Sequence, residues 1–308
     1  MKQMKKTMTI SFIGLALVLS FCPFDVCACE EGSARDASYW KKMYSEPRLF
    51  LFPLEPLSFS SPAGPSHAFN EDGIKALARG DNDEAEMKFS EAIRITPDSA
   101  PLRHNLALVF YKKLDLERAA GLWEEAVQLD RGNPRYLYHL AFAFSSGGRV
   151  EEAIPLYQDL LAKMHPQPEI YNNLGQLFEF KGDVVQAEKN FRRAVTLRPD
   201  YLPALDNLGR FYRKSGRLKE AERILKKVAR LRPGDAENYI NLGTLYSDMG
   251  RKAQSAVYLR KAIRLRPDYP EVHLLLSGVY REMGRIKQAH DEELLARAVT
   301  CQLRPNME

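Results

Sequence analysis

Cysteine, tryptophan and unbalanced charge are scarce in this sequence. Its 308 residues include four cysteines and two tryptophans, and the formal net charge is only +5. Four cysteines are too few for a disulfide framework. The small, mixed charge excludes the dense basic surface that nucleic-acid binding requires. The hydrophobic fraction of 45% and the charged fraction of 28% are those of an ordinary soluble protein.

Catalytic motifs are also missing from the sequence. It contains no His-Glu-x-x-His motif, no glycine-rich phosphate loop and no nucleophile elbow. Two of the six scattered histidines, His104 and His139, fall at neighbouring places in the repeats described below. Without a carboxylate between them, two histidines are more typical of ordinary surface residues than of a metal or acid–base pair. We therefore expect no enzyme, no cofactor and no metal site.

Residues 1–28 have the pattern of a secretory signal peptide. Three lysines precede an apolar stretch over residues 8–22, and the small residues Val26 and Ala28 stand at −3 and −1 before Cys29. The apolar stretch is shorter than the roughly 20 residues of a membrane-spanning helix. Two kinds of processing fit: cleavage by ordinary signal peptidase, or a loose lipobox in which Cys29 becomes lipidated.

The expected location follows from this segment. We expect export to a bacterial envelope, either free in the periplasm or lipid-anchored, with secretion as the alternative. Contact with a membrane would come only through the signal segment or the lipid anchor.

Residues 30–65 are predicted to be a linker. Five prolines and several serines keep such a stretch extended and out of helical structure. A short apolar piece, residues 49–52, lies within it. We favour a plain spacer over the alternative, in which this piece docks on the remainder of the chain or on a partner.

From residue 66 the sequence repeats every 34 residues without an insertion. Counting positions from the start of each unit, position 7 is leucine in six units and position 8 is always Gly, Ala or Ser. Position 11 is aromatic in six units, position 20 is Ala or Ser, and position 24 is mostly aromatic or leucine. The units span residues 66–99, 100–133, 134–167, 168–201, 202–235, 236–269 and 270–303.

The spacing has a direct physical meaning. Each unit holds two apolar helices, at about positions 1–14 and 17–31, and positions 7 and 11 lie on one face of the first. Small residues at positions 8 and 20 allow the two backbones to approach closely, and the large residue at position 24 fills the space between neighbours. Glycine at position 15 permits a left-handed helix end, and proline at position 32 stops the second helix.

These residues make the chain resemble the tetratricopeptide repeat family over residues 66–303. The resemblance implies an all-α fold, a right-handed superhelical α-solenoid of seven helix-turn-helix units. Residues 304–308 then form a short tail. Polar residues replace the pattern in the outer units, at Asp72 and Glu293, as the ends of a stack require.

In such a stack the first helices line a concave groove, and position 6 should face it. That position carries Asn105, His139, Asn173, Asn207 and Asn241. An asparagine amide both donates and accepts hydrogen bonds, so a row of them can hold a peptide backbone. The row resembles the asparagine ladder of O-linked N-acetylglucosamine transferases, which binds substrate peptides. The alternative is that these asparagines only tie neighbouring helices together.

Other groove positions predict the character of the ligand. Arg210 and Arg213, with Lys214, form a basic centre in the fifth unit, and Tyr138 belongs to an aromatic end near units two and three. An acidic side chain or a C-terminal carboxylate would pair with that basic centre. A solvated charged face is the alternative.

The sequence as a whole predicts a non-enzymatic scaffold that binds a protein or an extended peptide. Its architecture is similar to that of exported repeat lipoproteins that help to assemble pili, secretins or polysaccharide export machines. The alternative function is a regulatory or recruiting subunit for a separately encoded envelope hydrolase or transferase.

Overall fold

The computed structural model describes residues 55–58 and 64–303. The predicted signal peptide over residues 1–28, the lipidation site Cys29, residues 49–52 and the tail over residues 304–308 lie outside these ranges. Within them the chain forms helices and no strand. The helices are α2 (Pro65–Arg79), α3 (Asn82–Ile95), α4 (Ala100–Lys112), α5 (Leu116–Leu129), α6 (Pro134–Ser146), α7 (Val150–Lys163), α8 (Pro168–Lys181), α9 (Val184–Leu197), α10 (Leu202–Lys214), α11 (Leu218–Leu231), α12 (Ala236–Asp248), α13 (Lys252–Leu265), α14 (Pro270–Glu282) and α15 (Ile286–Leu303).

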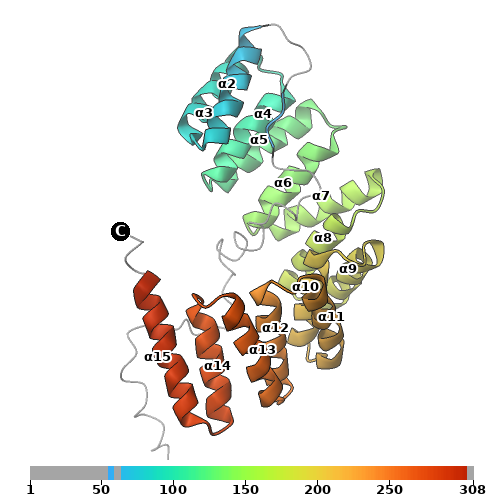
Figure 1. Ribbon diagram of the computed structural model, residues 1–308. Coiled ribbons are helices and arrows are strands. Elements are labelled where there is room, and N and C mark those ends of the chain that lie inside the picture. Colours follow the sequence, from blue (N-terminus) through green and yellow to red (C-terminus); the bar gives the residue numbers. More distant parts are fainter. Residues whose placement is uncertain (1–54, 59–63, 304–308) are drawn as a thin grey trace, which may run out of the picture.

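These helices form seven consecutive pairs, and the pairs follow one another along an arc (Figure 1). Each first helix packs on the second helix of its own unit, and each second helix packs on the first helix of the next unit. First helices of neighbouring units also contact each other at α2–α4, α8–α10 and α12–α14, as expected on the inner side of a curved stack. The predicted α-solenoid is confirmed.

The turn inside each unit is closed by a residue in the left-handed backbone region. Glycine takes this conformation in six units, as predicted, for example Gly182 with φ 79° and Gly216 with φ 72°. The second unit has Leu114 there instead, with φ 64°. Side chains with a Cβ are strained in this region, so Leu114 carries a local energetic cost.

Packing within a unit joins position 8 of the first helix to position 24 of the second. A Cβ built on Gly175 would lie 2.6 Å from the ring of Phe191, and one on Gly209 would lie 2.7 Å from Leu225. The prediction that position 24 fills only the space between neighbouring units was therefore incomplete, because its side chain lies directly on the small residue of its own unit. This contact explains why position 8 is small.

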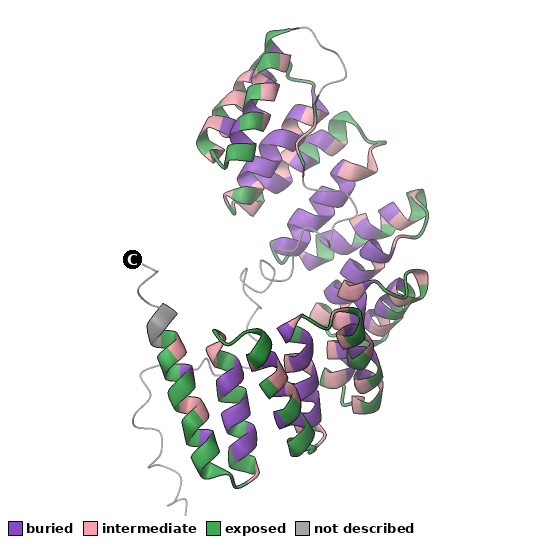
Figure 2. Cartoon of the chain, in the orientation of Figure 1, coloured by how far each residue is buried: buried purple, intermediate pink, exposed green. Residues whose placement is uncertain are grey.

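The hydrophobic core runs along the whole stack. One group of buried side chains extends from α2 to α8 and a second from α9 to α15, and Phe178 on α8 packs against both. Figure 2 shows that α4, α6 and α8 are largely buried, whereas α15 is mostly exposed. In the last unit the contact between positions 8 and 24 is polar, since the Ser277 hydroxyl donates to the Glu293 carboxylate at 2.8 Å.

Candidate peptide-binding surface

The first helices present a set of polar contacts that repeats from unit to unit on one side of the stack. A residue at position 5 of one unit contacts position 6 of the next, and position 12 contacts position 13. Partners therefore stand 35 residues apart, one more than the repeat period. We call the side of the first helices that carries positions 5, 6, 12 and 13 the inner face. The pairs of this kind are Asn70–Asn105, Tyr138–Asn173, Asn172–Asn207, Glu179–Lys214 and Arg213–Asp248.

An extended piece of the chain itself lies against the inner face at α2 and α4. The amide N–H of Leu57 donates to Asn105 Oδ1 at 2.7 Å. The Leu57 carbonyl accepts from Asn105 Nδ2 at 2.9 Å and from Asn70 Nδ2 at 3.1 Å. The two asparagines are bonded to each other at 2.8 Å. The main-chain N–H and carbonyl of Leu57 are thus held by the side-chain amides of Asn70 and Asn105.

Residues 30–65 were interpreted as a plain spacer, and this contact corrects that interpretation for residues 55–58 alone. Residues 55–58 form neither helix nor strand and are held on the repeats, and the Leu57 side chain packs against the cluster of Ala100, Ala126 and Tyr136. The docking alternative had been assigned to residues 49–52, which lie outside the described ranges. Proline-rich composition indicated an extended backbone but not where that backbone would bind.

His104 extends the same contact by one residue. Its Nδ1 accepts a hydrogen bond from Trp123 Nε1 at 3.0 Å, so the proton sits on Nε2, which donates to the Glu55 carbonyl at 3.1 Å. Burial lowers the pKa of His104 to about 4, so the ring is neutral at physiological pH. Both ring nitrogens are thus engaged in hydrogen bonds within the chain.

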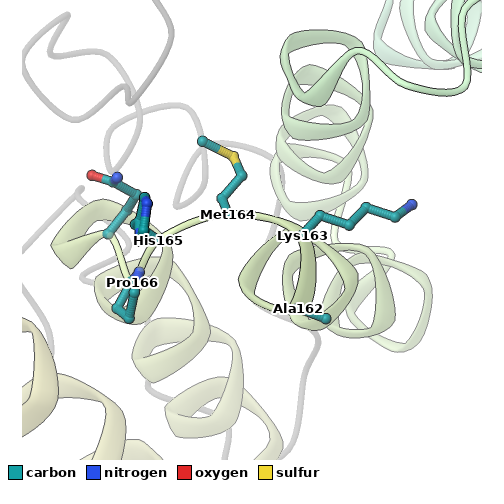
Figure 3. A pocket seen from close by; sticks show the side chains of 6 residues that line it. Ala162, Lys163, Met164, His165 and Pro166 are labelled. Atoms are coloured by element: carbon teal, nitrogen blue, oxygen red, sulfur yellow. The ribbon is translucent and has the colours of Figure 1, made fainter.

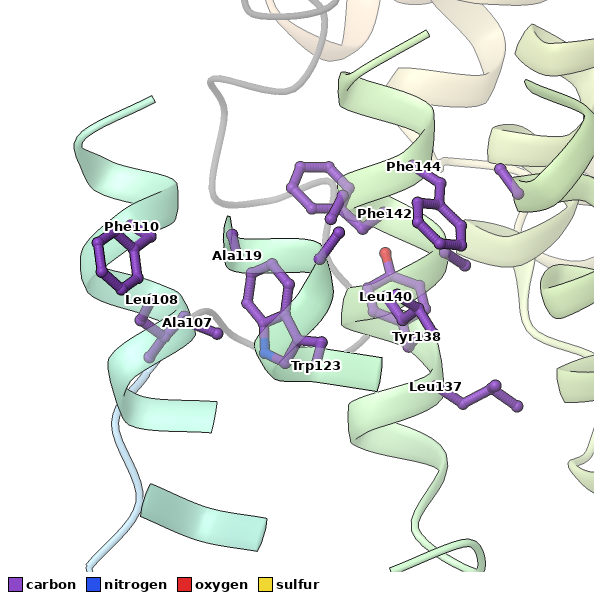
Figure 4. Close-up of a cluster of buried hydrophobic side chains, with 14 of the residues drawn as sticks. Ala107, Leu108, Phe110, Ala119, Trp123, Leu137, Tyr138, Leu140, Phe142 and Phe144 are labelled. Atoms are coloured by element: carbon purple, nitrogen blue, oxygen red, sulfur yellow. The ribbon is translucent and has the colours of Figure 1, made fainter. Parts of the chain in front are cut away.

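His139 stacks on His104 with 5.0 Å between the ring centroids, and it is fully buried. Its ring also lies against those of Trp123 and Tyr138, with centroids 5.6 and 5.8 Å away. Figure 4 shows Trp123 and Tyr138 among the buried side chains of this region. The aromatic end predicted for units two and three is therefore packed into the core of the molecule. These side chains support the inner face from below and do not form an exposed aromatic surface on which a ligand could stack.

The asparagines of position 6 have different surroundings in different units. Asn173 Nδ2 donates to Tyr157 Oη at 3.2 Å, and Asn207 Nδ2 donates to Asn172 Oδ1 at 2.9 Å. Asn241 is half-buried and makes no hydrogen bond to any described residue. Two of the predicted ladder residues thus tie helices together, Asn105 does so while also holding Leu57, and Asn241 has its amide available.

The cations predicted to form a basic centre are paired within the chain. Lys214 lies 2.8 Å from the Glu179 carboxylate, and Arg213 lies 2.7 Å from Asp248. Arg210 donates from Nη2 to Asn207 Oδ1 at 2.8 Å. Lys214 and Arg213 are thus neutralised by carboxylates of the chain, whereas Arg210 is bonded to a neutral amide. Of the predicted basic centre, only the charge of Arg210 is left for an acidic ligand, and that part stays a prediction.

At position 5 the sequence analysis singled out His104 and Tyr138 but missed the two asparagines, Asn70 and Asn172. Each of these contacts the asparagine at position 6 of the next unit. A search for polar residues separated by one period plus one residue would have found Asn70–Asn105 and Asn172–Asn207. The offset itself comes from the way successive units are stacked, which the period alone does not give.

Sites for chemistry are not apparent in the described part of the chain. No group of three or more His, Cys, Asp or Glu residues there has the geometry of a metal site. A surface hollow at the α7–α8 connection is lined by residues 162–167, the end of α7 and the loop that follows it, with His165 as its one titratable ring (Figure 3). Over residues 55–58 and 64–303, no helix is long and apolar enough to cross a membrane.

Solved structures with the same fold include a tetratricopeptide repeat protein from Parabacteroides merdae ATCC 43184, with 20% identity, a TM-score of 0.64, and coverage of 76% of this chain and 93% of that one. Another is the APC/C hetero-tetramer Cut9–Hcn1, with 20% identity, a TM-score of 0.56, and coverage of 70% and 42%. A third is the MamA RS-1 ArsTM double mutant, with 21% identity, a TM-score of 0.52, and coverage of 55% and 96%. At such identities these likenesses establish the fold alone.

The family comparison is more specific. No curated protein matches the sequence. The family model of the cilia and flagella-associated protein 70 middle TPR-like domain matches residues 136–300, more than half of the chain. Together with the seven helix pairs, this match shows that the chain belongs to the tetratricopeptide repeat family, in the group described by that TPR-like domain.

Proposed function

We propose that this protein is a non-enzymatic scaffold that binds an extended peptide, or an extended segment of a protein, along its inner face. The tetratricopeptide fold is a scaffold for contacts between proteins. The observation that carries the peptide proposal is the double hydrogen bond between the Leu57 main chain and Asn105. An amide that pairs with both the N–H and the carbonyl of one residue recognises backbone, whatever the side chain.

The same hydrogen bonds suit a partner segment that is unfolded before it binds. An extended peptide brings unpaired N–H and carbonyl groups, and each good hydrogen bond contributes about 1 kcal/mol net. Leucine side chains beside those groups can pack on small residues, as Leu57 does on Ala100. We therefore expect extended, moderately apolar ligands rather than acidic ones.

Location remains part of the proposal. Residues 1–28 have the pattern of an export signal, and Cys29 offers a lipid anchor, so we place the scaffold in a bacterial envelope, in the assembly of a pilus, a secretion system or a polysaccharide export machine. Intact-mass analysis of the protein from native membranes distinguishes a lipidated chain from a cleaved, unlipidated chain and from an unprocessed one. A chain beginning at lipidated Cys29 is expected if it is anchored, and an unprocessed Met1 terminus argues against export.

Asn241 provides the test of peptide binding. Peptides selected from a random dodecamer phage library on the full-length chain should lose about five- to tenfold in affinity when Asn241 is replaced by alanine, since one or two hydrogen bonds are lost. Because Asn241 makes no hydrogen bond to a described residue, the fold should be unaffected. Isothermal titration calorimetry measures the affinity and circular dichroism the helicity.

The matched control is Gln254→Ala, which removes an exposed amide from α13, a second helix of its unit. It should leave affinity unchanged. Selection of no peptide at all, or of peptides that bind the Asn241→Ala and wild-type chains equally, would contradict the proposed function of this face.

A further inference from the structure

The Asn172–Asn207 pair reproduces the pair that holds Leu57. In both, an asparagine at position 5 is followed 35 residues later by one at position 6, and Nδ2 of the second donates to Oδ1 of the first. The distances are 2.8 Å for Asn70–Asn105 and 2.9 Å for Asn172–Asn207. The first amide group is oriented by the second in each case, so the remaining donor of the first asparagine is directed alike.

The two pairs differ in what their remaining amide atoms contact. In the first, Asn70 Nδ2 donates to the Leu57 carbonyl and Asn105 Oδ1 accepts the Leu57 N–H. In the second, Asn172 Nδ2 is buried and has no hydrogen-bond partner among the described residues. Asn207 Oδ1, the counterpart of Asn105 Oδ1, accepts a hydrogen bond from Arg210 Nη2 instead of a main-chain N–H.

Further unpartnered groups surround Asn172 on α8. Asn173 Oδ1 and Gln176 Oε1 are acceptors with no hydrogen-bond partner, and their residues are 1% and 4% exposed. One free donor and two free acceptors therefore lie within five residues of one helix. A peptide main chain, with alternating carbonyl and N–H groups, offers the complementary set. Buried polar groups without hydrogen-bond partners raise the free energy of the folded chain. A ligand that pairs with them removes this cost, which adds to its free energy of binding.

We propose that the Asn172–Asn207 pair is a second main-chain-binding site for the extended partner of this scaffold. Asn172 Nδ2 donates to a partner carbonyl, and Asn207 Oδ1 accepts the N–H of the same partner residue once Arg210 has moved away. The inference rests on the proposed function of the inner face and assigns it a specific second location.

Arg210 has another acceptor to move to. Asp206 precedes it by one helical turn on α10 (i, i+4), and Asp206 Oδ1 is without a hydrogen-bond partner among the described residues. Burial raises the pKa of Asp206 to about 7, and the charge of Arg210 opposes that rise. Movement of the guanidinium from Asn207 to Asp206 would uncover the pair without leaving the arginine unpaired. Arg210 thus covers the site in the absence of partner, and its removal should favour binding.

The experiment uses a fluorescein-labelled peptide with the sequence of residues 53–60, Pro-Leu-Glu-Pro-Leu-Ser-Phe-Ser, and the full-length chain. Fluorescence anisotropy measures affinity. Asn172→Asp keeps the oxygen that accepts from Asn207 and replaces the free donor by an acceptor, so binding should weaken at least about tenfold. Arg210→Met keeps the aliphatic stem and should tighten binding about three- to fivefold.

The matched control is Gln254→Glu, the same change from amide to carboxylate at an exposed position of α13. It should not weaken binding of the added peptide. The Arg210→Met variant keeps the proposal testable if Asn172→Asp unfolds, because unchanged or weaker binding by Arg210→Met overturns the second site by itself. Equal weakening by Asn172→Asp and Gln254→Glu also overturns it.

Photo-crosslinking locates the peptide. With benzoylphenylalanine in place of Phe59, adducts on α8 or α10 support the second site, whereas adducts confined to α2 and α4, or no binding of the peptide, overturn it. This failure is distinct from that of the proposed function. Selected peptides that depend on Asn241, together with an octapeptide indifferent to Asn172 and Arg210, would leave the scaffold function and remove the second site.

Discussion

At the scale of single residues, the second unit is the exception to the glycine rule at position 15. Leu114 adopts φ 64°, and its side chain is 54% exposed, so it makes few contacts that offset the backbone strain. Leu114→Gly should raise the free energy of unfolding by about 0.5–1 kcal/mol, the relief of left-handed strain minus the added freedom of the unfolded chain. Urea denaturation measures the change.

The reciprocal substitution is its control. Gly216 has φ 72° in the fifth unit, with no atom near the position of a Cβ. Gly216→Leu should therefore destabilise by about 1 kcal/mol through the backbone alone. If both variants shift stability in the same direction, the conformational argument is wrong.

His104 should make stability depend on pH. Its pKa is lowered from 6.5 to about 4 by burial, so below pH 6.5 the unfolded chain binds a proton that the folded chain resists. Stability from this group is complete above pH 6.5 and falls as pH drops toward 4, with a loss of about 2–3 kcal/mol at pH 4.5.

Urea titrations at pH 7.0, 5.5 and 4.5 measure that loss. His104→Gln removes the ionisable ring and should show a shallower decline with falling pH than the wild-type chain. Parallel declines would place the acid sensitivity in other groups. Since His104 Nε2 donates to the Glu55 carbonyl, residues 55–58 should also become more accessible to protease over the same range.

At the scale of helices, close packing of each pair depends on position 8. Gly175 lies under the Phe191 ring with no room for a branched side chain. Gly175→Val should destabilise by about 1–3 kcal/mol through overpacking. Gly121→Val on α5, where no atom lies within 4 Å of the added Cβ, should be neutral or stabilising because glycine is a poor helix former. Thermal unfolding of both variants distinguishes steric crowding from a general effect of valine.

Much of the helical structure could be predicted from the sequence. The period of 34 located both helices of every unit, and for the fourth unit the expected positions 1–14 and 17–31 correspond closely to α8 (Pro168–Lys181) and α9 (Val184–Leu197). Small residues, glycine and proline have local meanings that no distant contact changes. The fold followed because each unit is specified by its own residues and its nearest neighbours.

The site was less predictable, for a physical reason. Whether Arg213 is a free cation or the partner of Asp248 depends on how far one unit slides past the next, and a repeat period contains no information on that offset. The role of Leu57 was hidden because it binds through its main chain, which any residue possesses. Hydrogen bonds to backbone leave no pattern of side chains to recognise.

At the scale of the whole molecule, the ends of the stack should open before its middle. In the described part of the chain, the unit of α14 and α15 contacts another unit on one side only, and Leu294 and Leu295 on α15 are about half exposed. Backbone amides of α14 and α15 should exchange hydrogen faster than those of α6–α8, which are buried between units on both sides. Hydrogen exchange followed by mass spectrometry gives the order, and uniform protection along the chain would indicate a single all-or-none opening instead.

The offset of 35 residues between paired side chains governs how this molecule can change in length. Removing or duplicating exactly one period leaves positions 5 and 6, and 12 and 13, facing each other across the new junction. An insertion of any other size inside a first helix displaces these positions from their partners in the neighbouring units. Growth by whole units is therefore the path open to such a chain. Each added unit supplies one more junction at which these positions meet, so the length of the inner face changes in steps rather than continuously.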